Sequence, residues 1–195
     1  MGDSGKQLAG LILAAGAASR YGSVKQLAEL GGIQLVVRAA RSLVPVCDAG
    51  VLVVTGAYHE AVADALAGEA VRCLYNPAWR EGIGASLRQG IGAFGERPAA
   101  VLVALADQPG LQTAHYQDLV NAWLQCTEQP AAAVYAGAPG VPAIFPRSYW
   151  HELAALRGDR GARGLLRAYA GLTRVDMPAA AWDVDEPADL DKGPA

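Results

Sequence analysis

A loop of small residues that ends at Lys25 is the segment best suited to hold a large anion. Residues 14–24 read Ala-Ala-Gly-Ala-Ala-Ser-Arg-Tyr-Gly-Ser-Val, directly after the apolar run 8–13. Small side chains let backbone N–H groups approach phosphate oxygens closely. Arg20 and Lys25 add positive charge to the same loop. The spacing of its glycines matches neither the Walker loop nor the dinucleotide fingerprint, so we expect a triphosphate site of a third kind.

Three aspartates have the chemistry of magnesium ligands. Asp107 directly follows the apolar run 101–106, whereas Asp183 and Asp185 lie two residues apart. In an extended segment such a pair faces one side, so both carboxylates could point at one metal ion. Mg²⁺ prefers one or two carboxylates together with phosphate oxygens and water. The alternatives are a turn at Asp107 before Pro109, and a helix cap at Asp185.

A second polar loop, residues 76–86, is punctuated by glycines and runs into a helical pattern. Gly82 and Gly84 would let a planar base lie close to the backbone. We expect Ser86 at the start of the helix, where its hydroxyl could cap the helix or bond a base edge.

Strand-like apolar runs alternate with helical patterns along the whole chain. This alternation predicts an α/β fold, a Rossmann-like, mostly parallel sheet with helices on both faces. The expected strands are 8–13, 49–55, 71–75, 99–106, 131–135 and 143–145, and the expected helices are 34–43, 58–67, 84–94, 113–125, 149–156 and 162–169. Ligands of such sheets bind at the carboxyl ends of the strands. The loops after Leu13, Tyr75 and Ala106 should therefore share one rim.

Composition narrows the function classes. The chain has 195 residues, is 52% apolar and carries a net charge of −3. We expect one domain over residues 1–195, and the acidic balance argues against a nucleic-acid partner. No apolar run reaches the roughly 18 residues of a membrane span. Residues 1–7 do not resemble a secretory signal, and the three cysteines show no disulfide or metal spacing, so we expect a cytoplasmic protein.

Five motifs in order give the chain a family resemblance. The pattern Leu-Ala-Ala-Gly-x-x-Ser-Arg-x-Gly-x-x-Lys resembles the signature loop of nucleotidyltransferases, and the other motifs lie at 76–87, 107–109, 158–163 and 183–190. Together they resemble the MocA-like molybdenum cofactor cytidylyltransferases of the MobA-like NTP transferase superfamily, over residues 8–190. The resemblance implies an NTP-binding part at about 8–110 and an acceptor-binding part at about 111–190.

The resemblance also implies roles for particular residues. The triphosphate loop would be Leu13 to Gly16 with Arg20 and Lys25, and Lys25 would stabilise charge on the α-phosphoryl group. Asp107 and Asp185 would bind Mg²⁺, with Asp183 as partner or alternative. The remaining roles are a base pocket formed by Ala14, Ala15, Gly82 and Ser86, and an acceptor phosphate bound by Arg163 with Arg160.

The implied reaction joins CTP and molybdopterin into the cytosine dinucleotide form, with release of pyrophosphate. Val141 stands where members usually have histidine, which leaves the acceptor open. The alternatives are guanylyl transfer to the same pterin, transfer to a sugar or polyol phosphate, and a non-catalytic accessory protein for a molybdenum hydroxylase. An oxidoreductase that binds a reduced nucleotide is a further alternative.

Overall fold

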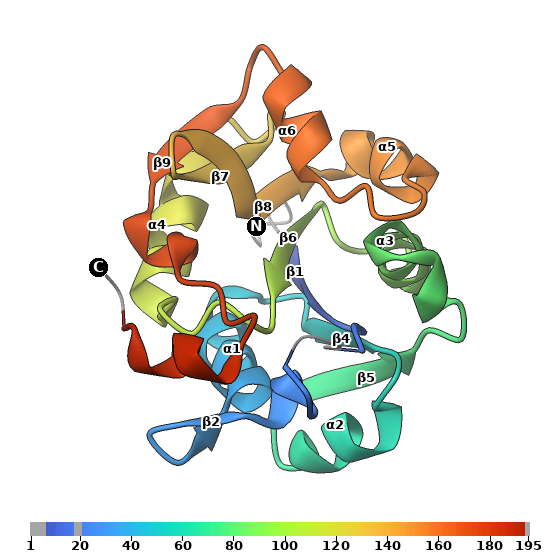
Figure 1. The fold of residues 1–195 in the computed structure, drawn as a ribbon. Coiled ribbons are helices and arrows are strands. Elements are labelled where there is room, and N and C mark those ends of the chain that lie inside the picture. Colours follow the sequence, from blue (N-terminus) through green and yellow to red (C-terminus); the bar gives the residue numbers. More distant parts are fainter. Residues whose placement is uncertain (1–6, 18–20, 194–195) are drawn as a thin grey trace.

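The computed structural model describes residues 7–17 and 21–193, and its centre is a seven-stranded sheet (Figure 1). The strand order is β5-β4-β1-β6-β8-β7-β9. The strands of this sheet are β1 (Leu8–Ala14), β4 (Val51–Thr55), β5 (Val71–Tyr75), β6 (Ala100–Leu105), β7 (Ala131–Tyr135), β8 (Ala138–Pro146) and β9 (Thr173–Asp176). A separate two-stranded hairpin pairs β2 (Glu29–Leu30) with β3 (Ile33–Gln34).

The sheet is parallel except at β8. β1 pairs in parallel with β4 and with β6, and β4 pairs in parallel with β5. β8 runs antiparallel to both β6 and β7, and β9 returns to a parallel pairing with β7. The carboxyl ends of β1, β4, β5 and β6 therefore meet at one edge, which is where a ligand is expected in such a sheet.

Helices cover both faces of the sheet, as the sequence pattern predicts. The helices are α1 (Leu35–Leu43), α2 (His59–Ala65), α3 (Ile83–Ala93), α4 (Thr113–Trp123), α5 (Trp150–Ala155) and α6 (Arg163–Ala168). Buried side chains of α1, α2 and α4 pack on one face, and those of α3, α5 and α6 pack on the other. Short 3-10 turns lie at Lys25–Leu27, Val44–Val46, Trp79–Glu81, Arg147–Tyr149, Pro178–Ala181 and Pro187–Asp191.

β1 shows how the two faces are sorted. Its side chains alternate, so Leu8, Ile12 and Ala14 join the core under α1 and α4. Leu11 and Leu13 join the core under α3 and α5 instead. A strand must expose alternate residues to opposite faces, and an apolar run fits here because helices bury both sides.

The expected fold class is confirmed, and most expected elements begin and end within two residues of their predicted limits. The last third differs. The short strand expected at 143–145 is the nine-residue β8, which forms a hairpin with β7 through Ala136 and Gly137. Both turn residues have positive φ, 48° and 75°, as a two-residue hairpin turn requires. Alanine rarely adopts that conformation, so a turn at Ala136 is not predictable from the residue type.

Three short strands also lay outside the sequence-based expectation, namely β2, β3 and the edge strand β9. Two to four residues are too few to show the alternation that identifies a strand. Within the described ranges, no helix has the length and hydrophobicity needed to cross a membrane.

Candidate active site

The edge where β1 and β6 end carries the candidate chemistry. Leu13 and Leu105 are register partners at the ends of these two strands, and Asp107 follows two residues later. Lys25 reaches the same place from the turn Lys25–Leu27. Asp107 and Lys25 are 82 positions apart in sequence. They meet because β1 and β6 are parallel neighbours whose carboxyl ends lie at the same edge of the sheet.

An ion-pair cluster forms around Lys25. Its Nζ donates to Asp107 Oδ2 at 2.7 Å and to Asp185 Oδ1 at 3.2 Å. The Lys25 side chain is only 12% exposed, compared with 24% for Asp107 and 49% for Asp185. Burial alone would lower the pKa of Lys25, but the carboxylates of Asp107 and Asp185 outweigh it, so the pKa is raised. Lys25 is therefore a fixed cation at the end of the first loop.

Asp183 completes a group of three carboxylates. Val184 is buried, and its N–H donates to the carbonyl of Asp107 at 3.0 Å, which anchors the segment between Asp183 and Asp185. Burial and the nearby charge of Asp107 raise the pKa of Asp183 to about 7. Such crowding of like charges is relieved by a cation placed among them.

The donor set suits Mg²⁺. Asp107 Oδ1 is buried and has no hydrogen-bond partner among the described residues. In that part of the chain, no three His, Cys, Asp or Glu residues form a closed metal site. Mg²⁺ does not need one, because one or two carboxylates, phosphate oxygens and water usually complete its six positions. Asp107 with Asp185 or Asp183 therefore has the chemistry to hold a magnesium ion whose other ligands would be phosphate oxygens or water.

The helix cap that the sequence offered as an alternative role for Asp185 is formed by Glu186 instead. Glu186 is the N-cap of the turn Pro187–Asp191 and forms a capping box with Asp189, whose Oδ2 accepts the N–H groups of Asp185 at 2.8 Å and Glu186 at 2.7 Å. The Asp185 carboxylate is turned toward Lys25 instead.

A pocket of about 620 Å³, here called the nucleotide-sized pocket, lies between the first loop and the second. Its lining includes Leu13, Ala15, Gly16, Gly82, Ser86 and Asp107, six residues that the sequence assigned to nucleotide binding. A neighbouring pocket of about 130 Å³ joins Ala14 and Gly16 to Lys25 and Asp107. The predicted triphosphate loop and base loop are thus two walls of one cleft.

Two residues of the predicted base pocket differ from expectation. Ala14 is absent from the lining of the larger pocket, because alternation along β1 turns its methyl to the opposite core face. Ser86 is not at the helix start: Gly82 is the N-cap of α3, and Ser86 lies one turn inside. The buried Ser86 hydroxyl accepts a hydrogen bond from Asn76 Nδ2 at 3.1 Å.

The sequence reasoning missed residues that shape this cleft. Buried Gln26 donates to the carbonyls of Ala14 at 3.2 Å and Gly16 at 2.8 Å, which fixes the first loop. Arg80 lines the nucleotide-sized pocket and lies over the ring of Trp79, with its Cζ 4.3 Å from the ring centroid, so it supplies a cation to this pocket. The only sequence signal for Gln26 was its position directly after the candidate lysine, Lys25. Nothing in the sequence indicated where Arg80 would point.

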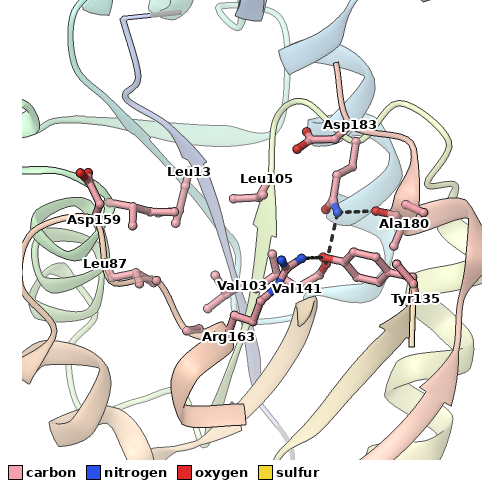
Figure 2. A pocket seen from close by; sticks show the side chains of 16 residues that line it. Leu13, Leu87, Val103, Leu105, Tyr135, Val141, Asp159, Arg163, Ala180 and Asp183 are labelled. Carbon is pink, nitrogen blue, oxygen red and sulfur yellow. Dashed lines mark hydrogen bonds between the residues drawn. The ribbon is translucent and has the colours of Figure 1, made fainter. Parts of the chain in front are cut away.

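A second pocket, of about 500 Å³, opens beside the first (Figure 2). Its walls include the apolar side chains of Leu87, Val103 and Val141. Arg163 lies in this pocket and donates to the Tyr135 hydroxyl at 3.3 Å, and Tyr135 donates to the carbonyl of Val141 at 3.0 Å. The two pockets share Leu13 and Leu105, so one floor continues from one to the other.

Gln108 fixes two walls of the second pocket. Its Nε2 donates to the carbonyl of Ala180 at 2.8 Å and to that of Val141 at 3.2 Å. The turn after β6 is thereby tied both to β8 and to the turn Pro178–Ala181. Arg160, the expected partner of Arg163, is exposed and lines neither pocket. Arg20 lies outside the described residues.

Comparison with known proteins agrees with this geometry. Residues 10–175 match the MobA-like NTP transferase domain. A nicotine blue oxidoreductase from Paenarthrobacter nicotinovorans is 32% identical over 165 residues, which are 81% of this chain and 80% of that protein.

Solved structures show the same fold. Rv0371c from Mycobacterium tuberculosis H37Rv is 24% identical with a TM-score of 0.80, covering 96% of this chain and 97% of that one. A nucleotidyl transferase from Methanothermobacter thermautotroptrophicus is 22% identical with a TM-score of 0.80, covering 96% of each chain. The chain belongs to the MobA-like NTP transferase family, a family of nucleotidyltransferases.

Proposed function

We propose that this protein transfers CMP from CTP to a molybdopterin-type acceptor, with Mg²⁺ as cofactor. The observation that carries the proposal is the continuous floor of Leu13 and Leu105 between a nucleotide-sized pocket and a second pocket. Asp107 follows the end of β6 and pairs with Lys25, close to where an α-phosphate would join the two ligands.

The reaction needs no nucleophile from the protein. An oxygen of the acceptor phosphate attacks the α-phosphorus, the bond from that phosphorus to the β-bridging oxygen breaks, and pyrophosphate leaves with the electron pair. Charge on the phosphoryl oxygens is the main quantity to stabilise. Lys25 can do so as a buried cation, and Asp107 with Asp185 or Asp183 would hold Mg²⁺, which neutralises triphosphate charge when bound.

The second pocket suits the acceptor. Arg163 offers a planar cation that can bind two phosphate oxygens at once. The apolar walls from Leu87, Val103 and Val141 would pack against the flat ring system of a pterin. Val141 stands in place of the usual histidine and adds an apolar side chain to this wall, so the acceptor ring would be held here by packing.

An NTP panel tests this function. Pyrophosphate release is measured for CTP, GTP, ATP and UTP with Mg²⁺, with and without molybdopterin. The proposal predicts acceptor-dependent release that is at least ~10-fold faster in kcat/KM with CTP than with GTP, a difference of only about 1.4 kcal/mol. Preference for GTP would indicate guanylyl transfer, and tight binding without release would indicate an accessory protein.

A second candidate function is that of an oxidoreductase. The relative named nicotine blue oxidoreductase favours it, because the 32% identity extends over four-fifths of both chains. In this alternative the nucleotide-sized pocket would hold a reduced nicotinamide nucleotide and the apolar pocket a flat organic substrate. A thermal-shift panel with NADH, NADPH, CTP and GTP separates the two. Stabilisation by the reduced dinucleotides alone would support the oxidoreductase.

A further inference from the structure

Asp159 lies at the junction of the two pockets and has no role in the function proposed so far. It lines the nucleotide-sized pocket and also the apolar pocket. Figure 2 shows its carboxylate across the pocket from Asp183, with Leu13 and Leu105 between them. A ligand that extends from one pocket toward the other would pass this side chain.

The position of Asp159 is set by close packing against the base loop. The N–H of Gly84 donates to the carbonyl of Gly158 at 3.0 Å. A Cβ atom on Gly82 would lie 2.5 Å from Asp159 Oδ1, and one on Gly84 would lie 2.9 Å from the nitrogen of Arg157. Both glycines are therefore required for this approach, and the loop that carries Asp159 rests on the loop expected to hold the base.

The chemistry of Asp159 limits what it can bind. No hydrogen bond or ion pair found among residues 7–17 and 21–193 involves its carboxylate. An ionised carboxylate only accepts hydrogen bonds. It would repel phosphate, so the ligand group opposite it must be a donor such as a hydroxyl or an amine.

The layout of a nucleotide selects between these donors. The phosphates belong near Lys25 and Asp107, and the base belongs against Gly82 and its helix. The ribose joins the two and must cross the floor of Leu13 and Leu105, beside which Asp159 stands. We propose that Asp159 accepts a hydrogen bond from a ribose hydroxyl and so makes the enzyme selective for ribonucleotides. This inference rests on the proposed function, because it requires a nucleotide in the larger pocket.

The test is a double-mutant cycle between protein and ligand. Calorimetry measures the Kd of CTP, 2′-deoxy-CTP and 3′-deoxy-CTP with Mg²⁺ for the wild type and for Asp159→Ala. For the wild type, removing the bonded hydroxyl should weaken binding about 10- to 100-fold, as expected for one charge-assisted hydrogen bond. Asp159→Ala should bind CTP more weakly than the wild type by a similar factor. It should bind the deoxynucleotide that lacks the bonded hydroxyl with the same Kd as the wild type.

Controls separate this inference from the proposed function. Asp118→Ala removes an exposed acid from α4, outside both pockets, and should leave every Kd unchanged. Equal losses for all three nucleotides in Asp159→Ala would overturn the ribose assignment. If no nucleotide binds the wild type, the proposed function fails and the inference fails with it.

Discussion

At the scale of single residues, Asp107 is the group on which the site depends most. It contacts Lys25, lies beside Asp183, and lines the nucleotide-sized pocket. Asp107→Asn keeps the shape but removes the charge, so turnover should fall at least ~10²-fold, as for other losses of a main electrostatic element. Steady-state pyrophosphate release measures the fall, and circular dichroism checks the fold. Near-normal turnover would remove Asp107 from the mechanism.

Lys25 should act differently from a simple binding residue. Its charge is fixed and largely buried, so it can respond to charge that develops on the α-phosphoryl group. Lys25→Ala should lower kcat more than it raises the Kd of CTP, because it removes an interaction that strengthens in the transition state.

Arg20→Ala is the comparison for Lys25→Ala and should mainly raise the KM for CTP, since a guanidinium holds two phosphate oxygens. Kinetics and calorimetry on both variants separate the effects. Small, equal effects would show that neither cation contacts the triphosphate.

The raised pKa of Asp183 predicts a pH dependence of stability. The folded protein holds this proton up to about pH 7, whereas an unfolded aspartate releases it near pH 4. The contribution of Asp183 to the free energy of unfolding therefore falls between about pH 4 and pH 7 and is constant above. The stability advantage of Asp183→Asn over the wild type should grow across that window.

Urea unfolding in EDTA at pH 4.5, 6 and 8 measures this advantage for Asp183. Added Mg²⁺ should reduce the advantage at pH 8, because a bound cation favours the ionised carboxylate. An advantage that is equal at the three pH values would contradict the assignment.

At the scale of elements, the contact between α3 and the loop before α6 joins the two pockets. Gly84→Ala would place a Cβ atom 2.9 Å from the backbone of Arg157, so overpacking should destabilise the protein by about 1–3 kcal/mol and weaken CTP binding. Gly92→Ala in the same helix has nothing within 4 Å and is the matched control. It should stabilise the helix by about 0.5–1 kcal/mol. Thermal melts of both variants check the prediction, and similar shifts would contradict it.

Element by element, the parallel half of the sheet was predictable and the last third was less so. β1, β4 and β6 are continuous apolar runs, which the sequence shows directly because both faces are buried. The sequence predicts only three residues of β8, because Gly140 and Pro142 interrupt its apolar run. β9 is too short to show an alternating pattern. Ala14 lines the smaller pocket beside Lys25 rather than the nucleotide-sized one, because the alternation of β1 turns its methyl group to the other face of the sheet.

At the scale of the whole molecule, the site depends on how distant segments converge. The order of the motifs was enough to predict that Lys25, Asp107 and Asp185 lie close together, because each belongs to a motif of the family pattern. The convergence of Arg80 and Asp159 on the nucleotide-sized pocket depends on loop packing between α3 and residues 157–161, which has no local sequence signal. The fold thus positions the nucleotide-sized pocket beside an apolar pocket, and this arrangement is the basis of the proposed transfer.

The most direct measurement follows the α-phosphate itself. CTP labelled at the α-phosphorus is incubated with the protein, Mg²⁺ and molybdopterin, and the products are separated. We expect the label to move into a pterin cytosine dinucleotide, with one unlabelled pyrophosphate released for each product formed. Label that stays in CTP, with NADH or NADPH oxidised instead in the presence of a flat organic substrate, would contradict it.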